Sequence, residues 1–543
     1  MSRTPAPPFR RLLIANRGEI ALRIIRACRE LGVEPIAVYS DADAGARHVR
    51  AADRAIRIGP GPATESYLRG DRIVEAALEA GAEAVHPGYG FLSEQASFAR
   101  ACAAAGLVFV GPEPETLEAL GDKLAARRAA SAAGVPIAAG TFEPVLGDGG
   151  LPVVGVMEIA AGIGYPLLVK AAAGGGGRGM RLVEAPAGLL EAIASASREA
   201  QAAFGDGTVY LERYLVAARH IEVQLLGDAH GTIVALGERD CSTQRRHQKL
   251  VEEAPAPGIS PERRRELHGL AVTVARRVGL RNAATAEFLL GHDGHLAFLE
   301  VNARLQVEHG VTELVSGVDL VQEQLWVAAG RPLPRRVILA AAETVRPRRH
   351  AIEVRISAED PARNFAPVPG RLTRWREPGG PGVRVDSGVE EGTLVSGEYD
   401  PLLAKLEVVA EDRRAALARL RRALDEFEIG GLQTTLPFHR WLAGHPPFVA
   451  GHLRTDLVEL DWHPEAIREA AAQRAARAVV RAMAQVEAGQ GWGSGANAGA
   501  KHASSALAPA TTGGREPTLH GPGAPPADGW KAAGRRDATE RWR

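Results

Sequence analysis

The sequence Thr285-Ala-Glu-Phe-Leu-Leu-Gly-His-Asp-Gly-His-Leu-Ala-Phe-Leu-Glu-Val-Asn-Ala-Arg304 predicts two strands joined by a tight turn. Asp293-Gly294 is a strong signal for a two-residue hairpin turn. That turn places Glu287 opposite Glu300. Directly opposed side chains have Cβ atoms about 4.5–5.5 Å apart, so two carboxylates in these positions repel each other. Because a hard cation with oxygen ligands removes the repulsion, we predict a magnesium site here.

The second strand continues as an alternation of polar and apolar residues. A period of two places the polar residues on one face. They are Glu300, Asn302, Arg304, Gln306 and Glu308. A solvated strand face is the simple alternative, but the mixture of amide, guanidinium and carboxylate groups opposite Glu287 favours a site. Eight steps span about 26 Å when extended, so we expect the chain to bend, with its two ends serving different groups.

The composition excludes several classes of protein. The chain has 543 residues, 45% hydrophobic and 24% charged, with 65 basic and 65 acidic residues. The balanced charge gives no general attraction to nucleic acid or to an anionic membrane. Three widely separated cysteines indicate neither a disulfide framework nor a metal site. With no apolar run long enough to span a membrane, we expect a soluble, cytoplasmic protein.

Residues 9–120 alternate strands and helices. Strands are predicted at residues 11–15, 35–39, 84–86 and 107–110, and helices at 19–31 and 71–80. This order is typical of a doubly wound, Rossmann-like parallel sheet. The first loop, Asn16-Arg-Gly-Glu19, is not a G-x-G-x-x-G turn, which excludes a nicotinamide site. The glycine-rich segment His86–Glu94 is either a tight turn or a ligand contact.

Residues 121–210 contain a helix at 123–133 and a glycine run between two strands. The strands are predicted at residues 165–170 and 180–184, with Gly174–Gly177 between them. The run is not a Walker A loop, because neither Gly-Lys-Ser/Thr nor a helix follows it. A flexible turn is one interpretation. Lys170 just before the run favours the other, in which backbone N–H groups bind phosphates.

The remaining chain is predicted to be an antiparallel sheet with helices, followed by a tail. Strands are expected at residues 352–356, 383–386 and 404–409, and a helix at 413–426. From residue 464 the chain is rich in Ala, Gly, Pro and Arg, which indicates one helix to about Gln485 and then disorder. The fold class is therefore α/β and α+β, multidomain, with parts at 9–120, 121–330, 345–460 and 464–543.

Taken together, these motifs closely resemble biotin carboxylase over residues 9–460. The strings that carry the resemblance are Ile14-Ala-Asn-Arg-Gly-Glu-Ile-Ala21, His86-Pro-Gly-Tyr-Gly-Phe-Leu-Ser-Glu94, Gly174–Met180, Glu238–Lys249, Glu252–Pro257 and Leu305-Gln-Val-Glu-His309. The resemblance implies a Rossmann-like N-terminal domain, an ATP-grasp domain with a lid at about 140–210, and a C-terminal domain. It also implies a ligase that forms carboxybiotin from ATP, bicarbonate and protein-linked biotin.

The same resemblance assigns expected roles to residues. ATP would contact Lys123, Lys170, Gly176, Gly177, Glu212, Arg213, Leu215, His220, Gln244, His247, Glu287 and Glu300. Two Mg²⁺ or Mn²⁺ ions would be held by Glu287, Glu300 and Asn302. Bicarbonate would bind Lys249, Arg304, Gln306 and the backbone of Val307. The catalytic residues would be Lys249, Arg304, Glu308 as the base, and Arg355, which would stabilise the enolate oxygen of biotin.

The sequence also predicts partners. It contains neither a Glu-Ala-Met-Lys-Met biotin-attachment sequence nor a carboxyltransferase domain. We therefore expect biotin on a separate biotin carboxyl carrier protein, and carboxyltransferase subunits as further partners. The resemblance also implies a homodimer. Acetyl-CoA carboxylase, an enzyme of fatty acid biosynthesis, is the simplest complex, with pyruvate, propionyl-CoA, methylcrotonyl-CoA or urea as alternative acceptors. A catalytically inactive assembly partner is disfavoured, because Glu308, Arg304, Lys249 and the metal carboxylates are all present.

Overall fold

The computed structural model describes residues 6–146, 152–172 and 179–465, together with isolated residues up to Met483. The described residues up to Trp462 belong to one compact unit, and those from His463 onward belong to a second. In the second unit, the described residues from Pro464 to Met483 are helical, which agrees with the predicted helix. The glycine run at 174–177, including Gly176 and Gly177, and the rest of the predicted tail lie outside the described residues.

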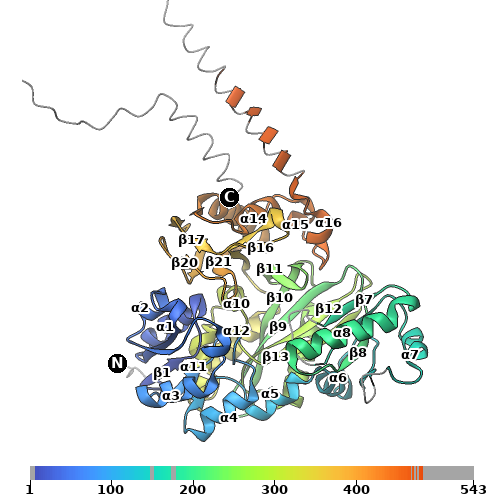
Figure 1. The fold of residues 1–543 in the computed structure, drawn as a ribbon, viewed down its shortest axis with the longest axis horizontal. Helices are drawn as coiled ribbons and strands as arrows, with labels where there is room; N and C mark the ends of the chain where they lie inside the picture. The colour runs from blue at the N-terminus through green and yellow to red at the C-terminus, as the bar shows by residue number, and fades with distance from the viewer. Residues whose placement is uncertain are drawn as a thin grey trace, which may run out of the picture. The chain divides into compact units, whose positions relative to one another are not determined.

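The N-terminal segment forms the predicted doubly wound parallel sheet, drawn in blue in Figure 1. The strand order is β3-β2-β1-β4-β5. The strands are β1 (Arg11–Ile14), β2 (Glu34–Ser40), β3 (Arg54–Gly59), β4 (Ala84–His86) and β5 (Val108–Phe109). The helices are α1 (Gly18–Leu31), α2 (Arg47–Ala51), α3 (Gly70–Ala80), α4 (Ala96–Ala104), α5 (Pro114–Gly121) and α6 (Lys123–Ala132). The sequence prediction missed β3, because Arg54 and Arg57 interrupt this short edge strand, which therefore lacks the continuous apolar run of a buried strand.

A separate three-stranded antiparallel sheet follows. Its order is β7-β6-β8, and it contains the two strands predicted on either side of the glycine run. The elements are α7 (Val156–Ile163), β6 (Leu167–Ala171), β7 (Met180–Val183), α8 (Leu189–Phe204) and β8 (Val209–Arg213). Val169 of β6 and Ile193 of α8 belong to one apolar core, which fixes the helix on the sheet.

An eight-stranded sheet forms the centre of the first unit. Its order is β13-β12-β9-β10-β11-β14-β21-β19, and every neighbouring pair is antiparallel. Its strands are β9 (Arg219–Gly227), β10 (Ile233–Arg245), β11 (Gln248–Ala254), β12 (Asn282–Leu290), β13 (Leu296–Asn302), β14 (His350–Ser357), β19 (Val383–Ser387) and β21 (Leu402–Ala410). The sheet expected in residues 345–460 is thus an extension of the central one, joined to it where β14 pairs with β11. The borders between the expected domains remain predictions.

Helices surround this sheet, and smaller strand pairs complete its C-terminal end. The helices are α9 (Pro261–Arg277), α10 (His309–Ser316), α11 (Leu320–Ala328), α12 (Arg335–Glu343), α13 (Arg413–Glu426), α14 (Leu436–Leu442), α15 (Pro446–Ala450) and α16 (Leu457–Asp461). The small strands are β15 (Glu359–Asp360) with β16 (Ala366–Pro367), β17 (Gly370–Arg371) with β20 (Leu394–Val395), and β18 (Arg374–Arg376) with β22 (Glu428–Gly430).

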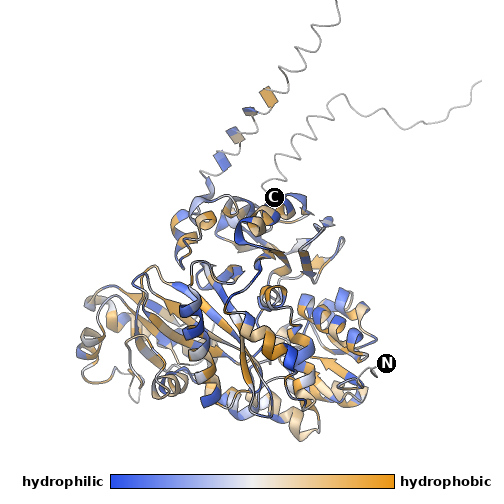
Figure 2. Ribbon diagram, turned by 180° about the vertical axis from the view of Figure 1, so that it is seen from behind, coloured by the Kyte–Doolittle hydropathy of each residue, from blue (hydrophilic) through white to orange (hydrophobic). Residues whose placement is uncertain are grey.

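The helices have the mixed composition expected of elements with one buried face. Hydrophobic and hydrophilic residues alternate in colour along them in Figure 2. One core contains Ile24 of α1 and Leu325 of α11, so it joins the N-terminal segment to the helices that follow β13. Among the described residues, none of the helices has the length and apolar character needed to cross a membrane.

Candidate active site

The hairpin of β12 and β13 brings two carboxylates together. Glu287 lies directly opposite Glu300, as predicted. The predicted two-residue turn is wrong, because the loop contains three residues, 292–294, and its closing pair is Gly291 and His295. A register shift between Glu287 and Phe288 compensates for the extra residue. A three-residue loop with glycine in the left-handed region is a common hairpin solution, and Gly294 has a φ of 81°.

The chain after β13 bends, so the predicted strand through Arg304 is too long. Strand β13 ends at Asn302, and Glu308 lies immediately before α10. The bend brings the two ends of the polar run together. The Asn302 amide donates to Glu287 Oε1 at 2.9 Å, and the Gln306 amide approaches the same oxygen at 3.3 Å. Arg304 donates to Gln306 Oε1 at 2.9 Å. The expected bend is therefore confirmed, and it brings the residues into one cluster. That the two ends serve different groups remains a prediction.

Lys249 of β11 lies at the centre of this cluster. Its Nζ atom is 3.0 Å from Glu287 and 2.7 Å from Glu308, and it also donates to Glu222 of β9. Arg239 of β10 donates to the other oxygen of Glu222 at 2.5 Å. Two basic side chains thus share the buried Glu222, so this residue sets the position of Lys249.

Glu222 was not among the residues predicted from the sequence. The signal was present, because His220, Glu222 and Gln224 alternate with apolar residues in β9. Arg239 was also not predicted; it lies in the consecutive polar run Glu238-Arg-Asp240 of β10, and its guanidinium donates to Gln224 at 2.8 Å. Buried polar side chains at alternate positions on a central strand need partners, and here they supply the supports of Lys249.

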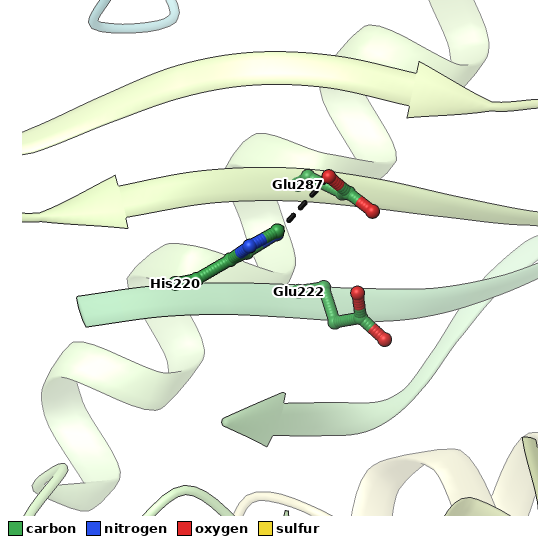
Figure 3. A group of neighbouring side chains, drawn as sticks. All are labelled: His220, Glu222 and Glu287. Atoms are coloured by element: carbon green, nitrogen blue, oxygen red, sulfur yellow. Dashed lines mark ion pairs between the residues drawn. The ribbon is translucent and has the colours of Figure 1, made fainter. Parts of the chain in front are cut away.

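Three donor side chains meet on β9 and β12 (Figure 3). Possible metal-ligand atoms of His220, Glu222 and Glu287 lie within 4.8 Å of one another. His220 Nε2 is 3.0 Å from Glu287 Oε2. Burial acts to lower the pKa of His220, but the Glu287 carboxylate outweighs it and raises that pKa above its ordinary value.

The carboxylates fit a hard divalent cation. Burial acts to raise the pKa of Glu287, but Lys249 and His220 outweigh it and hold that pKa well below its ordinary value, so the group is ionised. Glu300 lies directly across from it, and Asn302 contributes an amide oxygen on the same strand. Oxygen donors of this kind suit magnesium or manganese.

Glu308 is fully buried between two cations. Lys249 binds one oxygen, and Arg355 of β14 binds the other at 2.8 Å. Burial acts to raise the pKa of Glu308, but Lys249, Arg355 and Arg239 hold it well below its ordinary value. Arg355 also pairs with Glu252 at 2.6 Å, a contact that the sequence did not predict. The arrangement is a held, ionised carboxylate beside two groups able to bind an anion.

A second group of cations lies beside the hairpin. Lys170 of β6 is 3.0 Å from Glu212, and Arg127 of α6 is 2.5 Å from the other oxygen of Glu212. Lys123 is 3.3 Å from Glu300. Because both Glu212 oxygens bind cations, a nucleotide contact from Glu212 would use its backbone. Arg127 was not predicted from the sequence, although it is almost completely buried and fixes Glu212.

The other predicted nucleotide residues lie on neighbouring segments. Arg213 ends β8, and Leu215 follows it, half-buried. Gln244 is buried and lies opposite Lys249 in the β10–β11 ladder. His247 lies in the turn of that hairpin with a φ of 66°, in the left-handed region. Burial lowers the pKa of His247, and Lys170 and His220 add to the effect while Glu459 opposes it.

The fold and this cluster of cations and carboxylates define an ATP-grasp ligase. Residues 122–336 match the family model described as "Carbamoyl-phosphate synthase L chain, ATP binding domain". Residues 8–117 match "Biotin carboxylase, N-terminal domain", and residues 353–460 match "Biotin carboxylase C-terminal domain".

Individual proteins agree with these matches. Biotin carboxylase from Allochromatium vinosum is 48% identical over 449 residues, which are 83% of this chain and 98% of that protein. The alpha subunit of rice (Oryza sativa subsp. japonica) mitochondrial methylcrotonoyl-CoA carboxylase is 48% identical over 452 residues, and the chain spans 60% of its length. The chain therefore belongs to the biotin carboxylase family.

A solved structure supports the fold as well. It is the biotin carboxylase domain dimer of 2-oxoglutarate carboxylase from Hydrogenobacter thermophilus, in complex with MgADP, ADP and bicarbonate. It has 44% sequence identity and a TM-score of 0.79, and the match covers 83% of this chain and 97% of that chain. The family and the ATP-grasp fold inferred from the sequence are thus confirmed.

Proposed function

We propose that this chain carboxylates biotin on a separate carrier protein, using ATP and bicarbonate, as the first half-reaction of acetyl-CoA carboxylase. The observation that carries the proposal is the position of Glu308. Its two carboxylate oxygens are bound by Lys249 and Arg355, beside the opposed pair Glu287 and Glu300. A base, two anion-binding cations and a metal-type carboxylate pair therefore lie in one cluster.

In this proposal bicarbonate binds among Lys249, Arg304, Gln306 and the backbone of Val307. A planar guanidinium can bind a planar carbonate through two hydrogen bonds. Glu308 removes the proton of bicarbonate, which makes it a better nucleophile toward the γ-phosphorus of ATP. The resulting carboxyphosphate breaks down to carbon dioxide and phosphate, and the phosphate accepts the ureido proton of biotin.

The nucleotide is proposed to lie between the small sheet and the hairpin. Lys123 and Lys170 bind its phosphates, with Gly176 and Gly177 over them. The remaining contacts are assigned to Glu212, Arg213, Leu215, His220, Gln244, His247, Glu287 and Glu300. Glu287, Glu300 and Asn302 hold two magnesium or manganese ions, which neutralise charge on the phosphate oxygens.

Arg355 is proposed to bind biotin as well as Glu308. Its guanidinium stabilises the enolate oxygen that forms when biotin loses its ureido proton, at the point where negative charge develops. Glu252 supports this role, because it binds the same guanidinium from the neighbouring strand.

The rest of the complex is also part of the proposal. We infer a biotin carboxyl carrier protein and carboxyltransferase subunits as partners, a cytoplasmic location, and a homodimer like the Hydrogenobacter thermophilus domain dimer. The similar rice protein belongs to a methylcrotonoyl-CoA carboxylase. Pyruvate, propionyl-CoA, methylcrotonyl-CoA and urea are therefore the alternative acceptors, to be distinguished by adding purified carboxyltransferases with each substrate.

The proposal is tested by ADP release from the purified chain with magnesium and ATP. Bicarbonate and then free biotin or a biotinylated carrier are added separately and together. We expect stimulation only when both are present, and Glu308→Gln should lower the stimulated rate by about 10²- to 10⁴-fold. Turnover that is indifferent to biotin would contradict the proposed acceptor while leaving the ATP-grasp assignment intact.

A further inference from the structure

Lys405 is a buried cation next to the candidate active site that has no role in the proposed reaction. It lies on β21 and is 0% exposed. Its Nζ atom donates to the carbonyl oxygen of Val307 at 2.7 Å. Val307 is the residue before Glu308, so a completely buried charge holds the backbone of the turn that carries the proposed base.

The position of Lys405 in the sheet explains how it reaches this turn. Lys405 on β21 lies directly opposite Arg355 on β14. Arg355 binds the carboxylate of Glu308, while Lys405 binds the carbonyl of the residue before it. Two neighbouring strands thus hold Glu308 at both ends, by its side chain and by its backbone.

Three carboxylates surround Lys405 on the other side. Its Nζ atom is 3.5 Å from Glu407, 3.8 Å from Glu19 and 3.9 Å from Asp386. Burial acts to lower the pKa of Lys405, but these carboxylates and Glu353 raise it above its ordinary value. At these distances the three carboxylates act on Lys405 through electrostatic attraction. Among the described residues, the Val307 carbonyl is the one group that accepts a short hydrogen bond from its ammonium group.

The start of helix α10 packs tightly against β21, which is a separate observation on the same turn. A Cβ atom added at Gly310, two residues after Glu308, would overlap the carboxylate of Glu407. Glu407 is fully buried and pairs with Arg384 at 3.2 Å. The start of α10 therefore lies directly against the carboxylate that accompanies Lys405, so the turn has little room to shift.

We propose that Lys405 is a positioning residue for Glu308: through the Val307 carbonyl it fixes the turn that aims the base at bicarbonate. This inference rests on the proposed function in one respect, which is that Glu308 is the base. Lys405 contacts Val307, whose backbone is proposed to bind bicarbonate, and its other described contacts, Glu19, Asp386 and Glu407, are not among the proposed metal ligands. Its effect is on the alignment of Glu308, and misplacement of a reacting group by about 1 Å can cost about 100-fold in rate.

The first test is Lys405→Met, which keeps the length of the side chain and removes the donor. We expect kcat to fall about 100-fold, with the KM for ATP changed by less than about threefold. The acid limb of the pH profile of kcat/KM for bicarbonate should also move to higher pH, because a released Glu308 leaves its cations and its pKa rises. A kcat within threefold of the unmodified chain and an unmoved limb would overturn the proposal.

The second test needs no turnover. Hydrogen–deuterium exchange of the full chain should become at least about tenfold faster at the amides of residues 307–311 in Lys405→Met, since the turn loses its support. Unchanged exchange there would contradict the positioning role whatever the reaction proves to be. Conversely, faster exchange in Lys405→Met, combined with an unmodified chain that ignores bicarbonate, would mean that the support exists but that the proposed function is wrong.

Two further variants separate positioning from general destabilisation. If Lys405→Met does not fold, the double variant Lys405→Met/Glu407→Leu is used instead, because it removes a buried carboxylate together with the cation. It is compared with the unmodified chain in the same assays. The matched control is Arg264→Met, which removes a buried cation that pairs with Glu238 and donates to the carbonyl of Val345 at 3.2 Å. Arg264→Met should lower stability but leave kcat and the exchange at residues 307–311 unchanged. If Arg264→Met and Lys405→Met changed kcat and this exchange equally, the inference would be overturned.

Discussion

Arg355 donates to Oε2 of Glu308 across 2.8 Å, and both residues belong to the predicted catalytic set. Lys249 occupies the other oxygen of the same carboxylate. A carboxylate held in this way is ionised but is a weak base, because its pKa lies well below the ordinary value. An incoming anion that takes over Arg355 or Lys249 therefore raises the pKa of Glu308, so substrate binding itself would strengthen the base.

This relationship predicts a pH effect of Arg355→Gln. With the cation removed, the pKa of Glu308 rises, so the carboxylate is protonated at a higher pH. The acid limb of bicarbonate-dependent ADP release should move upward, in addition to a lower rate. The measurement is kcat/KM for bicarbonate between pH 5 and 9. An unmoved limb would mean that Arg355 does not control the ionisation of Glu308.

Substitution of Glu300 should weaken metal binding. Glu300→Gln removes one of the two opposed carboxylates and also the partner of Lys123. We expect the magnesium concentration for half-maximal ADP release to rise about 10- to 100-fold, with partial recovery at saturating magnesium. Exposed Glu115 on α5 provides the control, since Glu115→Gln should leave the magnesium requirement unchanged.

The effect of Gly310→Ala on the free energy of unfolding should depend on the residue at position 407. Alone, the added methyl group meets the carboxylate of Glu407 and should lower the free energy of unfolding by about 1–3 kcal/mol. In a Glu407→Ala background the space is free, so the same substitution should cost much less. Urea unfolding of the four proteins of this cycle measures the coupling, and additive effects would contradict the contact.

Two adjacent glutamates should give opposite pH dependence of stability. Burial raises the pKa of Glu252 to about 7, against an ordinary value of 4.5, although Arg355 opposes the effect. The folded chain then binds a proton that the unfolded chain releases, so the free energy of unfolding falls as pH rises from about 4.5 to 7. Glu252→Gln should remove this decrease, which is about 3 kcal/mol.

The neighbouring Glu253 is the matched comparison. Burial acts to raise its pKa, but His350 and Arg413 outweigh it and lower that pKa to about 2. Its contribution is present above pH 4.5 and is lost as pH falls toward 2, so Glu253→Gln should lower stability at neutral pH. Urea unfolding at several pH values checks both signs. The same sign for the two variants would contradict the assigned pKa directions.

Much of the fold followed from local sequence patterns. Buried strands such as Arg11–Ile14 are short apolar runs, and α13 began and ended at the predicted residues. The opposition of Glu287 and Glu300 was also predicted correctly, although for an imperfect reason. The prediction assumed a loop one residue too short and a regular ladder. The real loop has one more residue, and an irregularity in β13 shifts the register by one residue, so Glu287 still lies opposite Glu300.

The supports of the site could not be predicted in the same way. Glu222 and Lys249 are 27 residues apart and meet because β9, β10 and β11 are neighbours in the sheet. Alternation shows that Glu222 faces the same side of its strand as His220, but it does not show which cation lies opposite. Arg239 and Arg127 were missed for the same reason, since long-range pairing decides which buried charges meet.

The continuity of the large sheet has a consequence for dividing the chain. Strand β11 lies before residue 345, β14 lies after it, and their ladder pairs Glu252 with Glu353. A fragment that stopped at residue 345 would leave β11 as an open edge with a row of unpaired backbone groups, which favours aggregation. The two segments should therefore fail to fold when expressed separately and recover only when co-expressed, because each one provides the missing half of a shared hydrogen-bonded surface.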